Sequence, residues 1–138
     1  MRILAVDPGS KRIGLALSDP TGTLARPLMV MKHVARLADA AAVAELAREE
    51  GAGLILVGQS LDDEGRPTFE GRRSARFAEA LKTQTDLKVE LWDETLTTQD
   101  ARAARIDMGV PRRKRSGHLD DLAATILLQS YLDAHSQL

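Results

Sequence analysis

The feature that most constrains this fold is the order in which short apolar runs and longer helical segments follow one another. Strands are expected at 3–6, 13–17, 24–31, 54–57 and 89–92, and helices at 35–50, 70–82, 97–108 and 119–134. Three successive strands favour an antiparallel meander, whereas strands joined through helices favour parallel pairing. We therefore predict an α/β domain with a five-stranded mixed sheet flanked by helices.

Single residues refine this prediction. Pro27 places its strand at an edge of the sheet, because proline cannot donate to a central ladder. Phe77 and Leu81 share one face of their helix, and 59–67 is expected to be a polar loop. The helix at 35–50 is predicted to bury a face made of Leu37, Ala40, Ala44 and Ala47.

Length and composition exclude several classes of protein. The 138 residues fit one domain, 1–138, and the absence of cysteine excludes disulfides and thiolate metal sites. Only three histidines are present, scattered along the chain, which argues against zinc. Charged residues interrupt the N-terminal apolar run, and no run reaches the roughly 18 apolar residues that a membrane span needs. We expect a cytoplasmic protein with no membrane association.

Positive charge is concentrated in one stretch, although the net charge is only −1. Residues 101–117 hold six basic side chains and one acid, with a run formed by Arg112, Arg113, Lys114 and Arg115. Such a run is typical of a solvated loop, and it is also suited to binding phosphates. Arg72, Arg73 and Arg76 either extend that surface or form a simple exposed face.

Three acids are candidates for a shared site. Asp7 ends the first strand and Glu94 follows the last one, so both would emerge at the same edge if those strands are parallel. Asp120, in the first turn of the last helix, joins them if that helix crosses the sheet with its N-terminus at this edge. Converging carboxylates repel one another, and a cation would relieve that repulsion.

Phosphodiester hydrolysis gives such a cluster a purpose. Mg²⁺, with Mn²⁺ as a substitute, takes oxygen ligands and can activate water in an in-line displacement. Each acid also has a structural explanation: a turn residue for Asp7, a solvated loop acid for Glu94, and a helix-dipole partner for Asp120. The catalytic interpretation therefore depends on the three acids together.

Taken in order, several segments resemble the YqgF/RuvX family of RNase H-like proteins. The resemblance covers nearly the whole chain and preserves the spacing of its motifs. The matching stretches are 7–16, Ser18-Asp19, Val57-Gly58, 93–98, 120–124 and 126–132. The most specific are Asp93-Glu94-Thr95-Leu96-Thr97-Thr98 and Asp120-Asp121-Leu122-Ala123-Ala124.

The resemblance implies an RNase H-like nuclease whose metal-binding, catalytic acids are Asp7, Glu94 and Asp120. It also implies a role in maturing the 5′ end of 16S ribosomal RNA, with Holliday-junction resolution as a second role. Lys11 and Arg12 lie in the first matching stretch and are expected to contact nucleic acid with the basic run. The family usually has Arg at the position of Thr95 and Leu-Pro at that of Gln59-Ser60, which affects substrate contacts rather than metal ligands.

Three functions remain to be separated. The leading one is a metal-dependent nuclease acting on structured RNA or on four-way DNA junctions. The second is a nucleic-acid- or ribosome-binding factor that does not cut, and the third is an actin-like phosphotransferase, for which the chain lacks a second lobe. Junction cleavage needs two symmetric cuts and favours a homodimer, but no dimer surface is evident, so monomer and homodimer both stay open. Trp92 is expected in the core.

Overall fold

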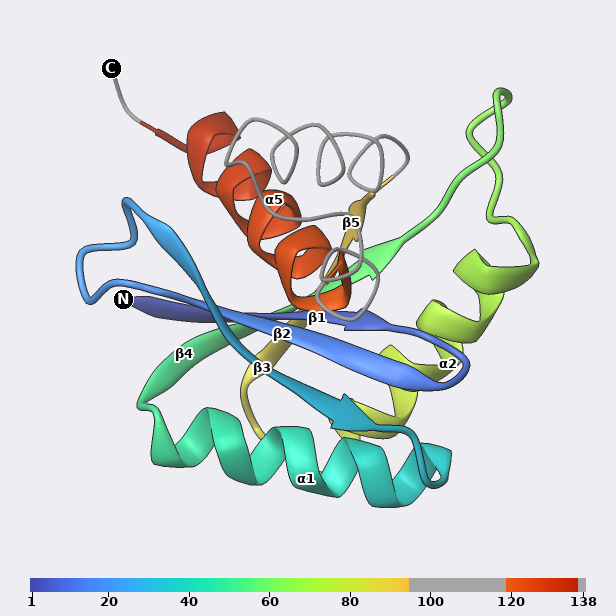
Figure 1. Cartoon of the computed structure of the whole chain (residues 1–138), viewed down its shortest axis with the longest axis horizontal. Coiled ribbons are helices and arrows are strands. Elements are labelled where there is room, and N and C mark those ends of the chain that lie inside the picture. The colour runs from blue at the N-terminus through green and yellow to red at the C-terminus, as the bar shows by residue number, and fades with distance from the viewer. Residues whose placement is uncertain (95–118, 137–138) are drawn as a thin grey trace.

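One mixed sheet organises the chain (Figure 1). The computed structural model describes residues 1–94 and 119–136, with side chains in the second range described from Asp121 onward. The strands are β1 (Arg2–Pro8), β2 (Arg12–Ser18), β3 (Ala25–Lys32), β4 (Ala52–Gln59) and β5 (Lys88–Asp93). The helices are α1 (Arg36–Glu49), α2 (Phe69–Lys82) and α5 (Leu119–Ala134). These positions confirm the predicted order of the elements within the described residues.

The sheet has the strand order β3-β2-β1-β4-β5. The first three strands form the antiparallel meander, and β4 is parallel to both β1 and β5. Pro27 does lie on an edge strand, where the β2–β3 register shifts between Leu15 and Ala16. The predicted five-stranded mixed sheet is therefore confirmed.

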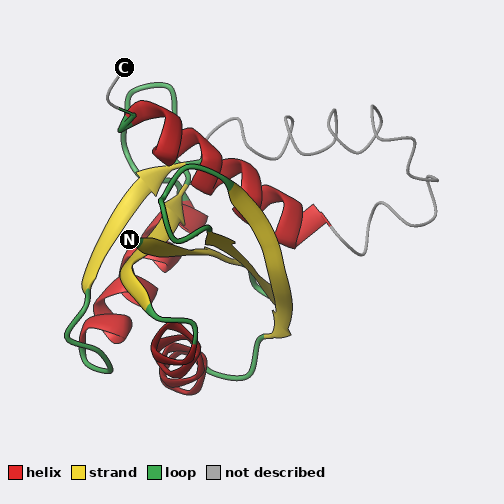
Figure 2. Ribbon diagram, turned by 90° about the vertical axis from the view of Figure 1, so that its left-hand side faces the viewer, coloured by secondary structure: helices red, strands yellow, loops and turns green. Residues whose placement is uncertain are grey.

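Alternation along the strands produces two hydrophobic layers. On β1, Leu4 and Val6 pack with α1 and α2 on one face, whereas Ile3 and Ala5 pack beneath α5 on the other. Figure 2 shows α5 on one side of the curved sheet and α1 and α2 on the opposite side. Side chains that project from the sheet on this face therefore contact the inner surface of α5.

The predicted inner face of α1 is wrong at one position. Leu37 is 62% exposed, whereas Ala40, Ala44 and Ala47 are buried as expected. Val43 packs in the core in its place, because the buried stripe of α1 is rotated away from Leu37 and toward Val43. The prediction for α2 is confirmed, since Phe77 and Leu81 are both buried.

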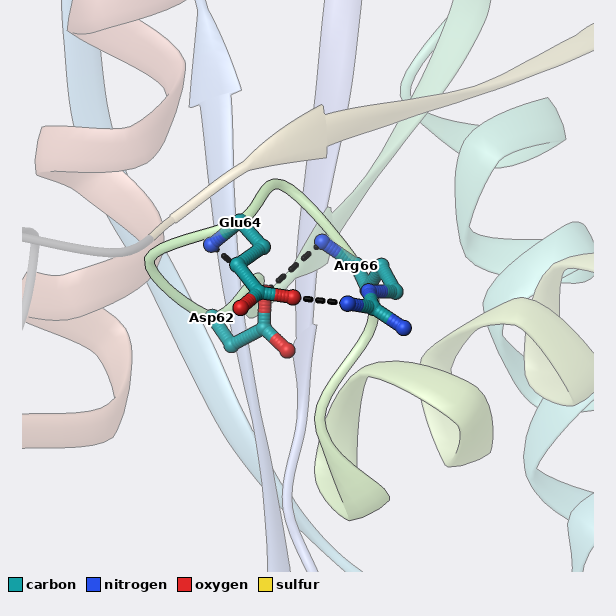
Figure 3. A network of polar contacts seen from close by, with 3 residues as sticks. All are labelled: Asp62, Glu64 and Arg66. Atoms are coloured by element: carbon teal, nitrogen blue, oxygen red, sulfur yellow. Dashed lines mark hydrogen bonds and ion pairs between the residues drawn. The ribbon is translucent and has the colours of Figure 1, made fainter.

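The predicted polar loop between β4 and α2 folds back on itself (Figure 3). Oδ1 of Asp62 accepts hydrogen bonds from the backbone N–H groups of Glu64 and Arg66, each at 2.9 Å. Arg66 forms an ion pair with Glu64, and a bridge between Leu61 and Pro67 closes the base of the turn. This compact turn keeps the path from β4 into α2 short.

The predicted helix at 97–108 and the basic run at 112–115 lie outside the described residues. Among the residues that the structure does describe, no helix has both the length and the apolar character needed to cross a membrane.

Candidate active site

Asp7 and Glu94 come from strands that β4 separates. Asp7 is the penultimate residue of β1, and Glu94 directly follows β5. Both strands run parallel to β4, so their carboxyl ends reach the same edge of the sheet. The backbone N–H of Glu94 donates to the carbonyl of Gln59 at 3.0 Å, which continues the β4–β5 ladder and fixes Glu94 in place.

The two carboxyl groups are in hydrogen-bonding contact. Burial is the largest cause that raises the pKa of Glu94 from its usual 4.5 to about 9, and the nearby charge and hydrogen bond of Asp7 raise it further. The charge of Asp93 adds a smaller contribution in the same direction. Without a cation the pair therefore holds a proton at neutral pH. The structure brings together two of the three predicted acids.

Gly58 is what allows the pair to meet across β4. It lies one residue beyond the Val6–Val57 pair and opposite Trp92 of β5. A Cβ added there would lie 2.7 Å from Oε2 of Glu94 and 2.9 Å from Cδ2 of Leu127. The space above Gly58 is thus filled by the Glu94 carboxyl and by the inner surface of α5. Val57-Gly58 is recognisable as a motif in the sequence, but the motif alone does not indicate this role of Gly58.

Substituting Gly58→Ala should therefore damage the site and the packing together. The added methyl must displace either the Glu94 carboxyl or Leu127, and overpacking of this kind costs about 1–3 kcal/mol. We expect a lower midpoint in urea denaturation and weaker protection by Mg²⁺ in the same experiment. Unchanged stability and unchanged protection would show that Glu94 does not need this space.

The third acid, Asp120, lies in the first turn of α5, and its side chain is outside the described residues. The direction of α5 shows toward which edge of the sheet this first turn points. Tyr131 and Leu132, near the C-terminal end of the helix, pack in the same cluster as Ile3 at the start of β1. Leu127, nearer the N-terminus, lies over Gly58. The helix therefore points its N-terminus toward the edge that carries Asp7 and Glu94.

The other predicted residues have mixed outcomes. Lys11 and Arg12 are exposed at the β1–β2 turn, next to this edge, where the Arg12 carbonyl accepts from Gly9 N–H at 2.9 Å. The basic run lies outside the described residues, as does Thr95. Trp92 is partly buried against Tyr131 with ring centroids 5.0 Å apart, which supports its predicted packing role.

Gln59 and Ser60, the two departures in the loop after β4, have structural partners. Nε2 of Gln59 donates to the carbonyl of Gly71 at 3.2 Å, and the Ser60 hydroxyl contacts that of Thr68. Thr68 in turn caps α2, because its hydroxyl accepts from the Gly71 N–H at 3.1 Å. These two polar side chains therefore tie the start of α2 to the end of β4.

The acids fit a hard divalent cation. Two carboxyls hold a proton where both would otherwise be charged, and a cation can replace that proton. Within the described part of the chain, no cluster of three Asp, Glu or His side chains forms a complete metal site. Two carboxylates with waters are enough to hold Mg²⁺, and the side chain of the third predicted acid, Asp120, lies outside the described residues.

Comparison with known families decides the relationship. A model of the family described as "RuvX: Holliday junction resolvase" matches residues 1–134. The chain belongs to the RuvX family. This confirms the resemblance seen in the sequence motifs.

Curated relatives of this RuvX protein share most of their length with it. A protein of Syntrophus aciditrophicus named "Putative pre-16S rRNA nuclease" is 42% identical over 137 residues, which cover 99% of this chain and 91% of the relative. A protein of Anaeromyxobacter with the same name is 41% identical over 133 residues, covering 96% and 97% respectively.

Solved structures confirm the RNase H-like fold of this RuvX chain. RuvC of Thermus thermophilus, in complex with a Holliday junction substrate, matches with a TM-score of 0.57 and 21% identity, covering 97% of this chain and 94% of RuvC. A fowlpox virus resolvase bound to Holliday junction DNA matches with a TM-score of 0.58 and 16% identity, covering 99% and 100%.

Proposed function

We propose that the chain is a metal-dependent endonuclease that hydrolyses phosphodiester bonds in structured nucleic acid. The observation that carries the proposal is the Asp7–Glu94 carboxyl pair, partly buried at the carboxyl edge of the sheet. Membership of the RuvX family supports it. Acids held together at a cost in electrostatic energy are concentrated at catalytic and metal sites, which favours cleavage over binding alone.

Asp7, Glu94 and Asp120 are the proposed ligands for Mg²⁺ or Mn²⁺. When bound, the metal would polarise the scissile phosphate and lower the pKa of an attacking water. Glu94 must release its proton before it can bind a cation, and the Gln59 carbonyl keeps its backbone in place. Asp7 is held by the β1–β2 ladder opposite Gly14.

The proposed substrate is precursor 16S ribosomal RNA, because the curated relatives are named for that RNA, and the family resemblance points to its 5′ end. We place this activity in the cytoplasm. Four-way DNA junctions are the second candidate, supported by the family description and by the junction-bound resolvases of the same fold. Junction cleavage would require a homodimer for its two symmetric cuts, whereas RNA trimming could be done by a monomer.

Incubating the pure protein with each substrate tests the proposal. Cleavage is expected with Mg²⁺ or Mn²⁺ and none with chelator. A preference for the RNA would support ribosome maturation, and paired cuts in the junction would support resolution. Binding to either substrate without metal-dependent cleavage of either would leave the chain as a non-catalytic binding factor.

The basic run gives a separate prediction. Replacing Arg112, Arg113, Lys114 and Arg115 together by Ala should weaken affinity for nucleic acid. Each lost phosphate contact should reduce the slope of log K against log salt by about 0.7–0.9. The matched control is Arg48→Ala, a basic residue at the last turn of α1 that pairs with Glu45. If affinity and salt slope stay unchanged in the four-fold variant, the run is only a solvated surface.

A further inference from the structure

An exposed aromatic ring lies at the start of α2 beside two arginines. Phe69, the first residue of the helix, is 57% exposed. The guanidinium carbons of Arg72 and Arg73 lie 6.0 and 5.5 Å from its ring centroid, because residues three and four positions apart share one helix face. Arg72 also donates to the Pro67 carbonyl at 3.3 Å, which restrains its side chain. We call these three residues the Phe69 platform.

A cavity of about 190 Å³ adjoins the platform, and Arg73 belongs to both. Its other basic lining residues are Arg36 and His33. The one acid in its lining, Asp39, is only 3% exposed and binds both His33 Nδ1 and the Val34 N–H. The two arginines therefore face the cavity with no free carboxylate in its lining, which makes it suited to an anion.

Both features lie at the end of the sheet that carries the acidic pair, the cavity on the face that α1 and α2 cover and the Glu94 carboxyl on the α5 face. Pro8 and Gly9, which directly follow Asp7, form part of the cavity wall. On the other side, the start of α2 is packed so closely on the end of β4 that a Cβ at Gly71 would lie 2.1 Å from the Ser60 carbonyl oxygen. The Gln59 carbonyl in turn receives the N–H of Glu94. The platform therefore packs against the end of β4, next to the point where Glu94 follows β5.

We propose that the Phe69 platform stacks an unpaired base of the substrate, while Arg73 and the adjoining cavity hold a neighbouring phosphate. Aromatic rings and guanidinium planes bind bases by stacking, and stacking requires a base whose face is not already covered in a duplex. This inference rests on the proposed nuclease function and narrows it. The nuclease then acts where a single-stranded segment crosses the catalytic edge.

A solvent-exposed phenylalanine alone would not support this proposal, since scattered surface apolar residues are common. Three observations together distinguish Phe69. Two arginines lie over its ring, one of them, Arg73, also lines a cavity with a second arginine, and the start of α2 packs on the end of β4 near the acidic pair. A folding role is a poor explanation, because Phe69 belongs to neither major core cluster of the described residues.

Phe69→Ala tests the stacking in the full-length chain with chelator present, so that no cleavage interferes. The probes are a labelled single-stranded oligouridine of about 12 nucleotides and a blunt hairpin duplex, measured by fluorescence anisotropy. Loss of one stacked base should weaken single-strand binding by about 5- to 150-fold. Duplex binding should change less than about twofold. The matched control is Leu24→Ala, which alters a side chain that is 64% exposed at the opposite edge of the sheet.

A second variant and a spectroscopic signal complete the test. Arg73→Ala should flatten the salt slope by about 0.7, whereas Phe69→Ala should leave that slope unchanged. A 2-aminopurine base in the oligonucleotide should be quenched by wild type and not by Phe69→Ala. Wild type that fails to bind the single strand, or Phe69→Ala that binds both probes like wild type, would overturn the inference. Metal-dependent cleavage by wild type, measured separately, decides the nuclease function independently.

Discussion

Replacing Asp7 by Asn should abolish most cleavage while leaving the fold and nucleic-acid binding intact. The amide keeps the size of the side chain and removes the charge that would hold the cation. Metal ions contribute several kcal/mol to such reactions, so a loss on the order of 10³-fold in rate is expected. The variant should also be at least as stable as wild type without metal, because Glu94 no longer faces a second carboxylate.

Single-turnover cleavage and binding in chelator measure these two effects separately. The matched control is Asp63→Asn, which makes the same change at an exposed position in the turn between β4 and α2. That control should cleave like wild type. Asp7→Asn protein that cleaves at an undiminished rate would place the activity at another site.

The positions at which the strands end in the sequence were sufficient to predict that Asp7 and Glu94 lie at the same edge of the sheet. Each acid follows a short apolar run, and the helices between the runs indicate that their strands are parallel, so a common edge followed from topology alone. The edge position of Pro27 followed from its missing N–H in the same way. These inferences needed only the pattern of strands and the chemistry of one side chain.

Features that depend on side-chain packing could not be predicted in this way. The role of Gly58 depends on the few ångströms between β4 and α5, and no sequence pattern gives that distance. Leu37 fits the helical period of α1, yet the helix is rotated so that Val43 reaches the core instead. The Phe69 platform appears only when α2 is known to begin at Phe69, one residue before its predicted start.

The raised pKa of Glu94 has a consequence for stability in the absence of metal. The folded protein keeps a proton on Glu94 up to a pKa of about 9, whereas the unfolded chain loses it near 4.5. Between these values the folded state binds more protons, so stability falls as pH rises, by up to about 1.4 kcal/mol per pH unit. A cation that replaces the proton should restore this stability.

Glu94→Gln should therefore stabilise the metal-free protein, by roughly 1–3 kcal/mol at pH 8, and flatten this dependence on pH. It should also lose most cleavage, because the amide cannot supply a charge to the cation. Glu90→Gln in β5 is the control with the opposite expected result. The hydrogen bond with Tyr131 lowers the pKa of Glu90, so its carboxylate stabilises the fold and this variant should be less stable than wild type. Urea denaturation in chelator from pH 6 to 9 compares the three proteins. If Glu94→Gln is less stable than wild type at pH 8, the Glu94 carboxyl stabilises the metal-free fold. That result would contradict the proposal that the two acids are destabilising without a cation and form a site for one.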